Sequence, residues 1–440
     1  FKMNESLLQT VSHIECIFVG SCNLSCEYCC IHKNPKEMHS YNNTIRKAIK
    51  DQTFQNNIKK QFETNKEHIT GLSLWSGEPT LNADLAETFL EPLLDFFPNL
   101  TDFMFSTNAI LGYEKGIAPY IKFFHRYAEQ HQRVIKLLIQ FSLDGPAEYT
   151  NKTRNYPNAA EIITQTIRDT VKATNTYCKN YFQVEVTTKP TVPAHFWPYM
   201  LERDNLLNWY KFFNKLTVEL VEIIEPDTKI RLCTAQEPTL VTPYDYTKED
   251  GINFAKLIHK MKEIDIKEIP EYSHPLIYRF ERCYHSTMGM NNCYGTEFRC
   301  GAGIGSIAID YQGHMVLCHR LYDNFRMGGE ASPFQELYSI TNEKELVRID
   351  YTNASFESNL TFINDNLSAL LHLMIKAGEI DPKYSQYDYI NLILSFAGGI
   401  VCFCGECGAQ THCHHLVPAS TIRLLCNGAL EELIQYYAKY

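Results

Sequence analysis

The feature that most constrains the fold is a regular alternation of short apolar segments with longer segments of helical periodicity, from His13 to about residue 264. The apolar segments are rich in β-branched and aromatic residues, which is typical of strands. Between them, segments such as residues 85–97 repeat apolar side chains at a spacing near 3.6, which indicates amphipathic helices. Strands that alternate with helices predict βαβ units, so we expect an α/β fold with a parallel sheet.

Six strands and six helices are expected in this part of the chain. The expected strands lie within residues 13–20, 69–79, 100–108, 134–145, 181–192 and 218–224. The expected helices cover residues 43–65, 85–97, 114–131, 158–176, 198–214 and 247–264. Six such units favour a partial, TIM-like (β/α)6 barrel over a flat doubly wound sheet, although periodicity alone fits both.

Four unusual loops each follow the carboxyl end of an expected strand. They cover residues 20–30, 76–79, 107–109 and 142–145. In parallel α/β folds this edge of the sheet carries the binding or catalytic site. The sequence therefore predicts one functional site, built from these four loops.

The chain changes character after about residue 270, where Gly, Cys and His become frequent and the alternation stops. We expect a short tail, a barrel and a cysteine-rich domain, over residues 1–12, 13–268 and 269–440. Within the last of these, two helix-like segments, 360–377 and 386–398, belong to an expected helical insertion at about 330–400.

The composition limits the function classes. A formal net charge of −10 argues against nucleic acid as the main partner, because phosphate binding needs clustered Lys and Arg. No apolar run approaches the roughly 18 residues of a membrane span, and no signal-peptide pattern occurs, so we expect no membrane contact and a cytoplasmic location. Sixteen cysteines are unusual for such a chain. Since cytosolic thiols stay reduced, dense cysteine indicates metal binding or catalysis rather than disulfides.

The first cysteine group is a CxxxCxxC motif formed by Cys22, Cys26 and Cys29. Three thiolates on one short loop suit three irons of a cubane 4Fe–4S cluster, whose fourth iron stays open to a chelating substrate. Zinc is the alternative, with His32 as the fourth ligand that a structural zinc site needs. Cys30 follows Cys29 directly, so the two side chains diverge and we expect Cys30 to be a bystander.

With its companion loops, this motif resembles the signature of the radical SAM superfamily. That signature is CxxxCxxC with an aromatic residue before the last cysteine, here Tyr28, at the end of a first strand. "SGEP" (76–79) is similar to the family's GGEP loop, with Ser76 in place of the first glycine. "STNA" (106–109) resembles the TNG motif, and "SLDGP" (142–146) the loop after the fourth strand.

The resemblance implies a 4Fe–4S cluster that binds S-adenosylmethionine (SAM) and generates a 5′-deoxyadenosyl radical, while the protein orients and shields it. Glu78 and its loop backbone would hold the SAM amino group. Ser, Asp and Arg side chains would contact its ribose or carboxylate, with an ordinary turn as the alternative for residues 142–145. The expected cofactor-binding residues are Tyr28, Ser76, Gly77, Glu78, Pro79, Thr107, Asn108, Ser142, Asp144 and Arg154.

The later cysteines resemble the SPASM domain that follows the barrel in many radical SAM enzymes. Residues 300–318 read C-x12-G-x4-C and predict a β-hairpin with Gly313 in its turn, and residues 404–413 read CxxCxxxxxC. The resemblance implies one or two auxiliary 4Fe–4S clusters, with two favoured; a zinc ribbon is the alternative. The expected ligands are Cys293, Cys300, Cys318, Cys402, Cys404, Cys407, Cys413 and Cys426.

Two positions depart from the family pattern. Val417 stands where the first auxiliary cluster takes its fourth ligand, so that cluster keeps an open iron or another residue substitutes. Cys402 is the first candidate, and the weaker ones are Cys283, His414 and His415. His319 stands where sulfatase-maturing members carry an Asp as catalytic base; we expect it to take a proton near neutral pH or to hydrogen-bond a cluster ligand.

The resemblance implies modification of a ribosomally synthesised peptide or protein by crosslinking, thioether formation, excision or epimerisation. Expected partners are the peptide substrate, an electron donor such as flavodoxin or ferredoxin and, because the barrel begins near residue 13, a separate leader-binding protein. Two alternatives remain open. One is a radical SAM dehydrogenase or methyltransferase acting on a small molecule, and the other is a non-catalytic zinc-binding protein.

Overall fold

The structure is a computed structural model. It describes residues 11–29, 35–202, 204–233, 239–241, 247–268, 306–316, 338–340, 346–348 and 430–438, with residues 373 and 376. The chain divides into two compact units. The first comprises residues 1–190, 212–235 and 302–349, and the second residues 191–211, 236–301 and 350–440.

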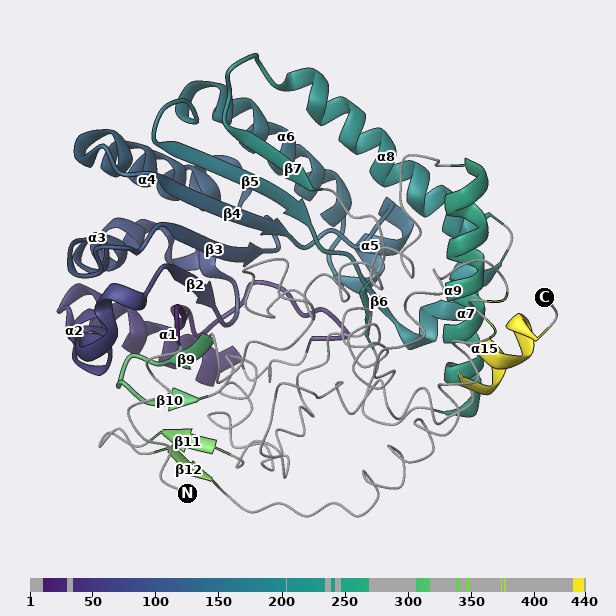
Figure 1. Cartoon of the computed structure of the whole chain (residues 1–440), viewed down its shortest axis with the longest axis horizontal. Helices are drawn as coiled ribbons and strands as arrows, with labels where there is room; N and C mark the ends of the chain where they lie inside the picture. Colours follow the sequence, from purple (N-terminus) through teal and green to yellow (C-terminus); the bar gives the residue numbers. More distant parts are fainter. Residues whose placement is uncertain are drawn as a thin grey trace. The chain divides into compact units, whose positions relative to one another are not determined.

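Strands and helices alternate along the described chain as far as α9 (Figure 1). The strands are β1 (His13–Ile17), β2 (Gly71–Trp75), β3 (Asp102–Thr107), β4 (Ile135–Phe141), β5 (Phe182–Thr188), β6 (Thr191–Pro193), β7 (Ile230–Cys233), β8 (Thr239–Val241), β9 (Ser306–Ile309), β10 (Met315–Val316), β11 (Tyr338–Ile340) and β12 (Leu346–Arg348). The helices are α1 (Pro35–Lys50), α2 (Thr53–Phe62), α3 (Ala86–Phe96), α4 (Ala118–His131), α5 (Ala147–Thr153), α6 (Ala159–Tyr177), α7 (Trp197–Leu201), α8 (Asn205–Ile223), α9 (Lys248–Glu268) and α15 (Leu430–Tyr437).

The first unit contains one large sheet. Its parallel part has the order β9-β1-β2-β3-β4-β5-β7, and β10, β11 and β12 extend it antiparallel beyond β9. β1 lies between two parallel neighbours, since His13 pairs with Gly71 on one side and with Ser306 on the other. The expected α/β fold with a parallel sheet is confirmed.

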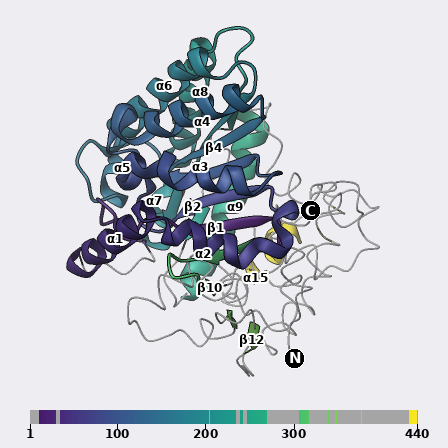
Figure 2. The same ribbon diagram turned by 90° about the vertical axis from the view of Figure 1, so that its left-hand side faces the viewer.

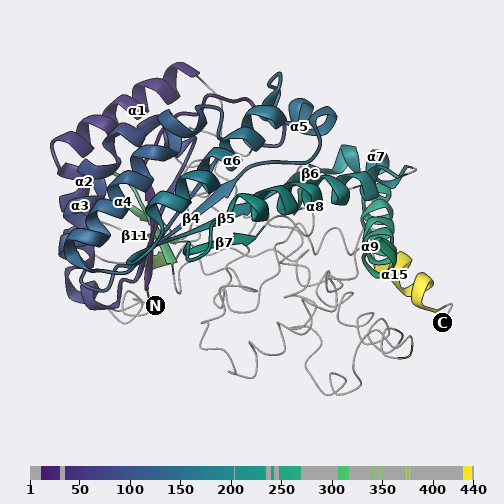
Figure 3. The ribbon, with the colours of Figure 1, turned by 90° about the horizontal axis from the view of Figure 1, so that it is seen from above.

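The core of this unit lies between the sheet and its helices. In β3, Phe103 and Phe105 are buried while Asp102 and Met104 are partly exposed, so successive side chains serve opposite faces. Phe103 packs on Phe124 of α4, with ring centroids 4.5 Å apart. Helices α3, α4 and α6 lie along the same side of the sheet (Figures 2 and 3).

The opposite face of the sheet is polar. It borders a cavity of about 620 Å³ at the starts of the strands. The charged and polar side chains around this cavity include His13, Asp102, Lys136, Gln183, Glu185 and Arg231. Such a face differs from the packed interior of a closed barrel, which is filled by branched apolar residues.

One expected strand is wrong. Residues 218–224 end helix α8 and do not form a strand. Phe213, Leu216 and Leu220 are buried at helical spacing, whereas the β-branched Val218 and Val221 are 52% and 57% exposed. The sheet is completed instead by β7, whose four residues are too few to show a periodicity.

Two expected helices each become two. The helix expected over 43–65 is α1 and α2, separated at Gln52, whose φ of 64° is left-handed and ends a helix. The helix expected over 198–214 is α7 followed by α8. The remaining four appear as α3, α4, α6 and α9, whereas the segments 360–377 and 386–398 lie outside the described residues apart from positions 373 and 376.

The expected hairpin is confirmed as far as Val316. β9 and β10 pair antiparallel around a turn in which the carboxylate of buried Asp310 accepts the backbone N–H groups of Gln312 and His314. Gly313 completes the turn with φ 87°. Cys318, which the hairpin was expected to deliver, lies outside the described residues.

The second unit is smaller in its described part. β6 and β8 form a parallel pair, and α9 packs against α7 and α15. Trp197 is fully buried and donates its indole N–H to the carbonyl oxygen of Val192 at 3.0 Å. Among the helices described here, none combines the length and the apolar character that crossing a membrane requires.

Candidate functional site

The cysteine loop begins where β1 ends and is anchored by three other segments. The backbone N–H of Phe18 donates to the carbonyl oxygen of Trp75 at the end of β2, at 3.2 Å. The N–H of Gly20 donates to Oδ1 of Asn42 on α1 at 3.0 Å. The N–H of Glu27 donates to the carbonyl oxygen of Thr153 on α5 at 3.3 Å. These contacts hold the loop over the carboxyl ends of the strands, as expected.

The loop over residues 76–79 packs directly on the cysteine loop. The N–H of Glu78 donates to the carbonyl oxygen of Ser21 at 2.8 Å. Gly77 has φ 49°, and a Cβ at this position would overlap the carbonyl group of Ser21. Ser76 also has a left-handed φ, of 73°. Only glycine fits at residue 77, because both the conformation and the close approach exclude a side chain.

Glu78 is buried and ties the ends of β2 and β3 together. Its Oε1 accepts the N–H of Thr80 at 3.1 Å and the hydroxyls of Thr80 and Thr107 at 2.6 and 2.7 Å. Its Oε2 accepts the N–H of Asn108 at 2.6 Å. Burial raises the pKa of Glu78, and these hydrogen bonds act in the opposite direction. The carboxylate therefore has a structural role inside the protein, whatever else it binds.

Asn108 reaches from the end of β3 to the first cysteine. Its Nδ2 donates to Oδ1 of Asn23 at 2.8 Å and to Sγ of Cys22 at 3.7 Å, and its Oδ1 accepts the N–H of Ile110. The N–H of Leu24 also donates to Sγ of Cys22, at 3.5 Å. Burial raises the pKa of the Cys22 thiol to about 12, and the charge of Glu78 acts in the same direction. A cation beside this sulfur would act in the opposite direction and favour the thiolate.

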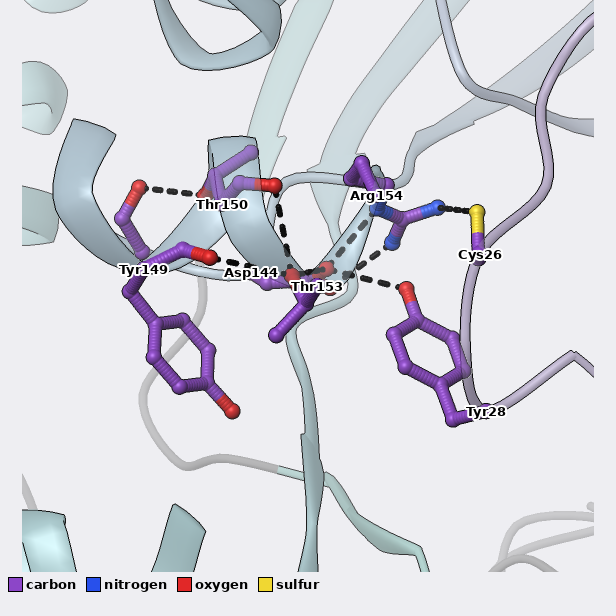
Figure 4. A network of polar contacts seen from close by, with 8 residues as sticks. Cys26, Tyr28, Asp144, Tyr149, Thr150, Thr153 and Arg154 are labelled. Atoms are coloured by element: carbon purple, nitrogen blue, oxygen red, sulfur yellow. Dashed lines mark hydrogen bonds and ion pairs between the residues drawn. The ribbon is translucent and has the colours of Figure 1, made fainter. Parts of the chain in front are cut away.

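A second buried network joins the cysteine loop to the end of β4 (Figure 4). Arg154 pairs with Asp144 through Nε at 2.8 Å and Nη2 at 2.7 Å. Oδ2 of Asp144 also accepts the hydroxyls of Tyr28 at 2.9 Å and Thr153 at 2.7 Å. The third nitrogen of the guanidinium, Nη1, donates to Sγ of Cys26 at 3.9 Å.

The charges of this network are almost fully removed from water, since Asp144 is 0% and Arg154 6% exposed. Burial lowers the pKa of Arg154, but the charge of Asp144 outweighs it and the pKa ends well above its usual range. Burial also raises the pKa of Tyr28, whose ring lies 5.3 Å from the guanidinium carbon. The arginine is therefore a fixed cation and the tyrosine a neutral donor.

The structure brings the expected site residues of the barrel to one edge of the sheet. Pro79 is buried and accepts the Tyr120 hydroxyl at its carbonyl oxygen, at 3.0 Å. Ser142 is half-buried, and its N–H donates to the carbonyl oxygen of Thr107. Thr80 and Thr153 belong to the same networks but were not expected; the only indication was their position next to motif residues.

The expected residues of the C-terminal part lie outside the described residues and stay predictions. They are His319, Cys293, Cys300, Cys318, Cys402, Cys404, Cys407, Cys413 and Cys426. Cys30 and His32 also lie outside them.

Within the described part of the chain, no group of three His, Cys, Asp or Glu side chains is placed as the ligands of one metal ion. In a cubane cluster each cysteine ligates a different iron. The N–H donors at Cys22 and Cys26 also fit a cluster, because hydrogen bonds to its sulfurs are part of how proteins hold and tune one.

One comparison with known proteins bears on the cysteine loop. Residues 13–158 match the family model described as a 4Fe-4S single cluster domain, and this range contains the cysteine loop and the three loops around it. No curated protein matches the chain. Among solved structures, SuiB of Streptococcus suis, bound to precursor peptide SuiA, is similar at 12% identity and a TM-score of 0.38, over 71% of this chain and 60% of that chain. The family match supports the expected 4Fe–4S cluster within residues 13–158.

Proposed function

We propose that this protein is a radical SAM enzyme that modifies a ribosomally synthesised peptide or protein. The observation that carries the proposal is the placement of the CxxxCxxC loop. It follows β1 of a parallel sheet, within a region that matches a 4Fe–4S domain. Cys22 receives an N–H group of Asn108 at the end of β3, and Cys26 receives one of Arg154, which follows α5. In parallel α/β folds this edge is where substrates bind.

Cys22, Cys26 and Cys29 are the proposed ligands of the cluster, which leaves one iron for SAM. When bound and reduced, such a cluster supplies the electron that cleaves SAM to methionine and a 5′-deoxyadenosyl radical. The loops of the chain would orient SAM and keep water from the site. Since these clusters need reducing conditions, we place the enzyme in the cytoplasm.

The SAM-binding role of the neighbouring loops is likewise a proposal. Glu78 already accepts four hydrogen bonds from the protein, so we assign it the task of holding the loop over 76–79. The carbonyl oxygens of that loop would take the SAM amino group. Arg154 uses three of its five N–H groups in the bonds to Asp144 and Cys26. The other two would suit the SAM carboxylate.

The substrate class rests on the cysteine pattern of residues 300–426, which resembles the SPASM domain. We propose that it holds auxiliary 4Fe–4S clusters, that His319 acts as a base beside them, and that an electron donor and a leader-binding protein complete the system. Whether the product carries a crosslink, a thioether, an excision or an inverted centre is a matter of which hydrogen is removed.

Anaerobic purification and reconstitution test the proposal. We expect a brown protein that converts SAM to 5′-deoxyadenosine in the presence of a strong reductant. Single Cys22→Ala, Cys26→Ala and Cys29→Ala variants should lose this reaction, and Cys178→Ala, which changes a buried cysteine beside β5, should keep it. A colourless zinc protein, or 5′-deoxyadenosine formation that survives loss of Cys26, would refute it. Mass spectrometry of a candidate precursor peptide then identifies the modification.

A further inference from the structure

Two of the three cysteines of the motif receive a hydrogen bond from a side chain outside their own loop. The sulfur of Cys22 meets Nδ2 of Asn108, which comes from the end of β3. The sulfur of Cys26 meets Nη1 of Arg154, which follows α5. Each donor side chain is buried and is held by a further hydrogen bond, so its direction towards the sulfur is fixed.

Arg154 is fixed in place by its neighbours. Asp144 binds its Nε and Nη2, and Tyr28 lies against the guanidinium plane. Asp144 is in turn fixed by the hydroxyls of Tyr28 and Thr153. Because Asp144 occupies two of the three nitrogens, the third is directed at Cys26 (Figure 4). Tyr28, which belongs to the cysteine loop, thus helps to fix the guanidinium group that donates to Cys26 in the same loop.

We infer that Arg154 and Asn108 are positioning residues that set the reduction potential of the cluster held by this loop. The inference rests on the cluster of the proposed function. Reduction adds one electron, delivered by an external one-electron reductant, and no bond forms or breaks. The added negative charge spreads onto the cysteine sulfurs. N–H donors and a buried cation at those sulfurs stabilise the reduced state and make reduction easier.

Potentiometric titration followed by electron paramagnetic resonance measures this property without turnover. The signal of the relevant cluster is identified as the one that SAM perturbs and that Cys26→Ala removes. Asn108→Leu is the first variant, because it keeps the approximate size of the side chain, adds no charge and removes the N–H donor to Cys22. The second is the pair Arg154→Gln with Asp144→Asn, which removes both charges so that neither stays buried without its partner.

A matched control changes an ion pair that lies away from the cysteines. Arg46 and Asp84 form a two-bonded pair like Arg154 and Asp144, but on the protein surface. We expect Asn108→Leu and the Arg154/Asp144 pair each to lower the midpoint potential by at least about 59 mV, which is tenfold in the equilibrium constant of a one-electron couple. Arg46→Gln with Asp84→Asn should leave it unchanged.

The failure of this inference is distinct from failure of the proposed function. If the unaltered protein forms no cluster on Cys22, Cys26 and Cys29, the proposed function falls and the inference with it. If the cluster forms in all variants at one potential, only the inference is overturned. Should the paired variant assemble no cluster, Asn108→Leu decides the matter alone, since it nearly keeps the side-chain volume and adds no charge.

Discussion

At the scale of single residues, the site depends on backbone conformations that side chains rarely allow. Ser76 and Gly77 are consecutive residues with positive φ, and the second lies against the carbonyl group of Ser21. A non-glycine residue in the left-handed region costs about 1–2 kcal/mol. The loop over 76–79 therefore keeps some backbone strain at Ser76. At position 77 only glycine fits, because a side chain would meet the carbonyl group of Ser21.

Substitutions at these two positions should have opposite effects. Gly77→Ala should destabilise the protein by at least about 1–2 kcal/mol from the left-handed conformation alone, and more because its Cβ meets Ser21. Ser76→Gly should leave the free energy of unfolding equal or slightly higher, because strain is relieved. Urea unfolding of both variants measures this. Equal destabilisation by both would show that φ is not what constrains the loop.

A half-buried histidine gives the fold a pH dependence. Burial lowers the pKa of His13 below 6.5, while the charges of Glu15 and Asp102 oppose the shift. A histidine with a depressed pKa stabilises the fold above its unfolded pKa, because below that value the unfolded chain binds a proton that the native state refuses. Stability should therefore fall as the pH decreases from about 6.5 towards the lower native value.

Urea unfolding at pH 7.5 and pH 5.5 tests this effect. His13→Gln should show a smaller loss of stability between the two pH values than the unaltered protein. His68→Gln changes an exposed histidine on the same unit and should behave like the unaltered protein. If the free energy of unfolding falls by the same amount between pH 7.5 and pH 5.5 in His13→Gln and in His68→Gln, His13 does not cause the pH dependence.

At the scale of elements, the hairpin of β9 and β10 is attached to the sheet by more than strand pairing. Nδ2 of Asn57 on α2 donates to the carbonyl oxygen of Tyr311 at 2.9 Å, and Nε2 of Gln61 donates to that of Gly313 at 3.2 Å. These bonds satisfy the backbone of a turn that is more than 250 residues away in sequence. α2 thus acts as a clamp for the hairpin.

Removing one of these bonds should loosen the hairpin selectively. Asn57→Ala should cost about 1–3 kcal/mol, because it leaves the Tyr311 carbonyl oxygen without its donor. Hydrogen exchange should accelerate in residues 306–316 and not in β4. Asn56→Ala, an exposed neighbour on the same helix, is the matched control and should change neither quantity. Uniform acceleration across the sheet would mean that the hairpin does not open as a separate unit.

These elements also show what the sequence could and could not predict. Five of the six expected strands are present because each is a local apolar segment of five or more residues with an abrupt end. The strand prediction for residues 218–224 was wrong because their β-branched side chains favour strands. Burial of Leu216 and Leu220 at helical spacing stabilises a helix instead. The place of β9 beside β1 was not predictable, since His13 and its partner Ser306 are far apart in the sequence and leave no local pattern.

The candidate site divides in the same way. Motif spacing predicted Tyr28, Glu78, Asn108, Asp144 and Arg154 as one site, and the structure brings them to one edge of the sheet. It did not predict that Arg154 and Asn108 bond to cysteine sulfur, because a side chain's partners depend on distances across the fold. Thr80 and Thr153 were missed because a lone threonine carries no pattern.

At the scale of the whole molecule, the prediction concerns how many clusters the chain holds. If residues 269–440 bind auxiliary clusters independently, a variant with Cys22, Cys26 and Cys29 all changed to Ala should still hold iron. Its iron content should fall by about four atoms per chain relative to the reconstituted protein, with the rest retained. Iron and sulfide analysis measures this. Loss of all iron would mean that the C-terminal cysteines bind no cluster of their own.

The pairing of β9 with β1 also means that one edge of β1 stays unpaired during much of translation. β1 ends at residue 17, and its partner β9 covers residues 306–309 of 440, so the segment between them must leave the ribosome before that side of β1 is covered. At about 5–20 residues per second, the wait is roughly 15–60 s. During that time the nascent chain presents an open strand edge, the kind of surface that pairs with other chains. The time until β9 pairs with β1 therefore sets how long the nascent chain is exposed to aggregation through this edge.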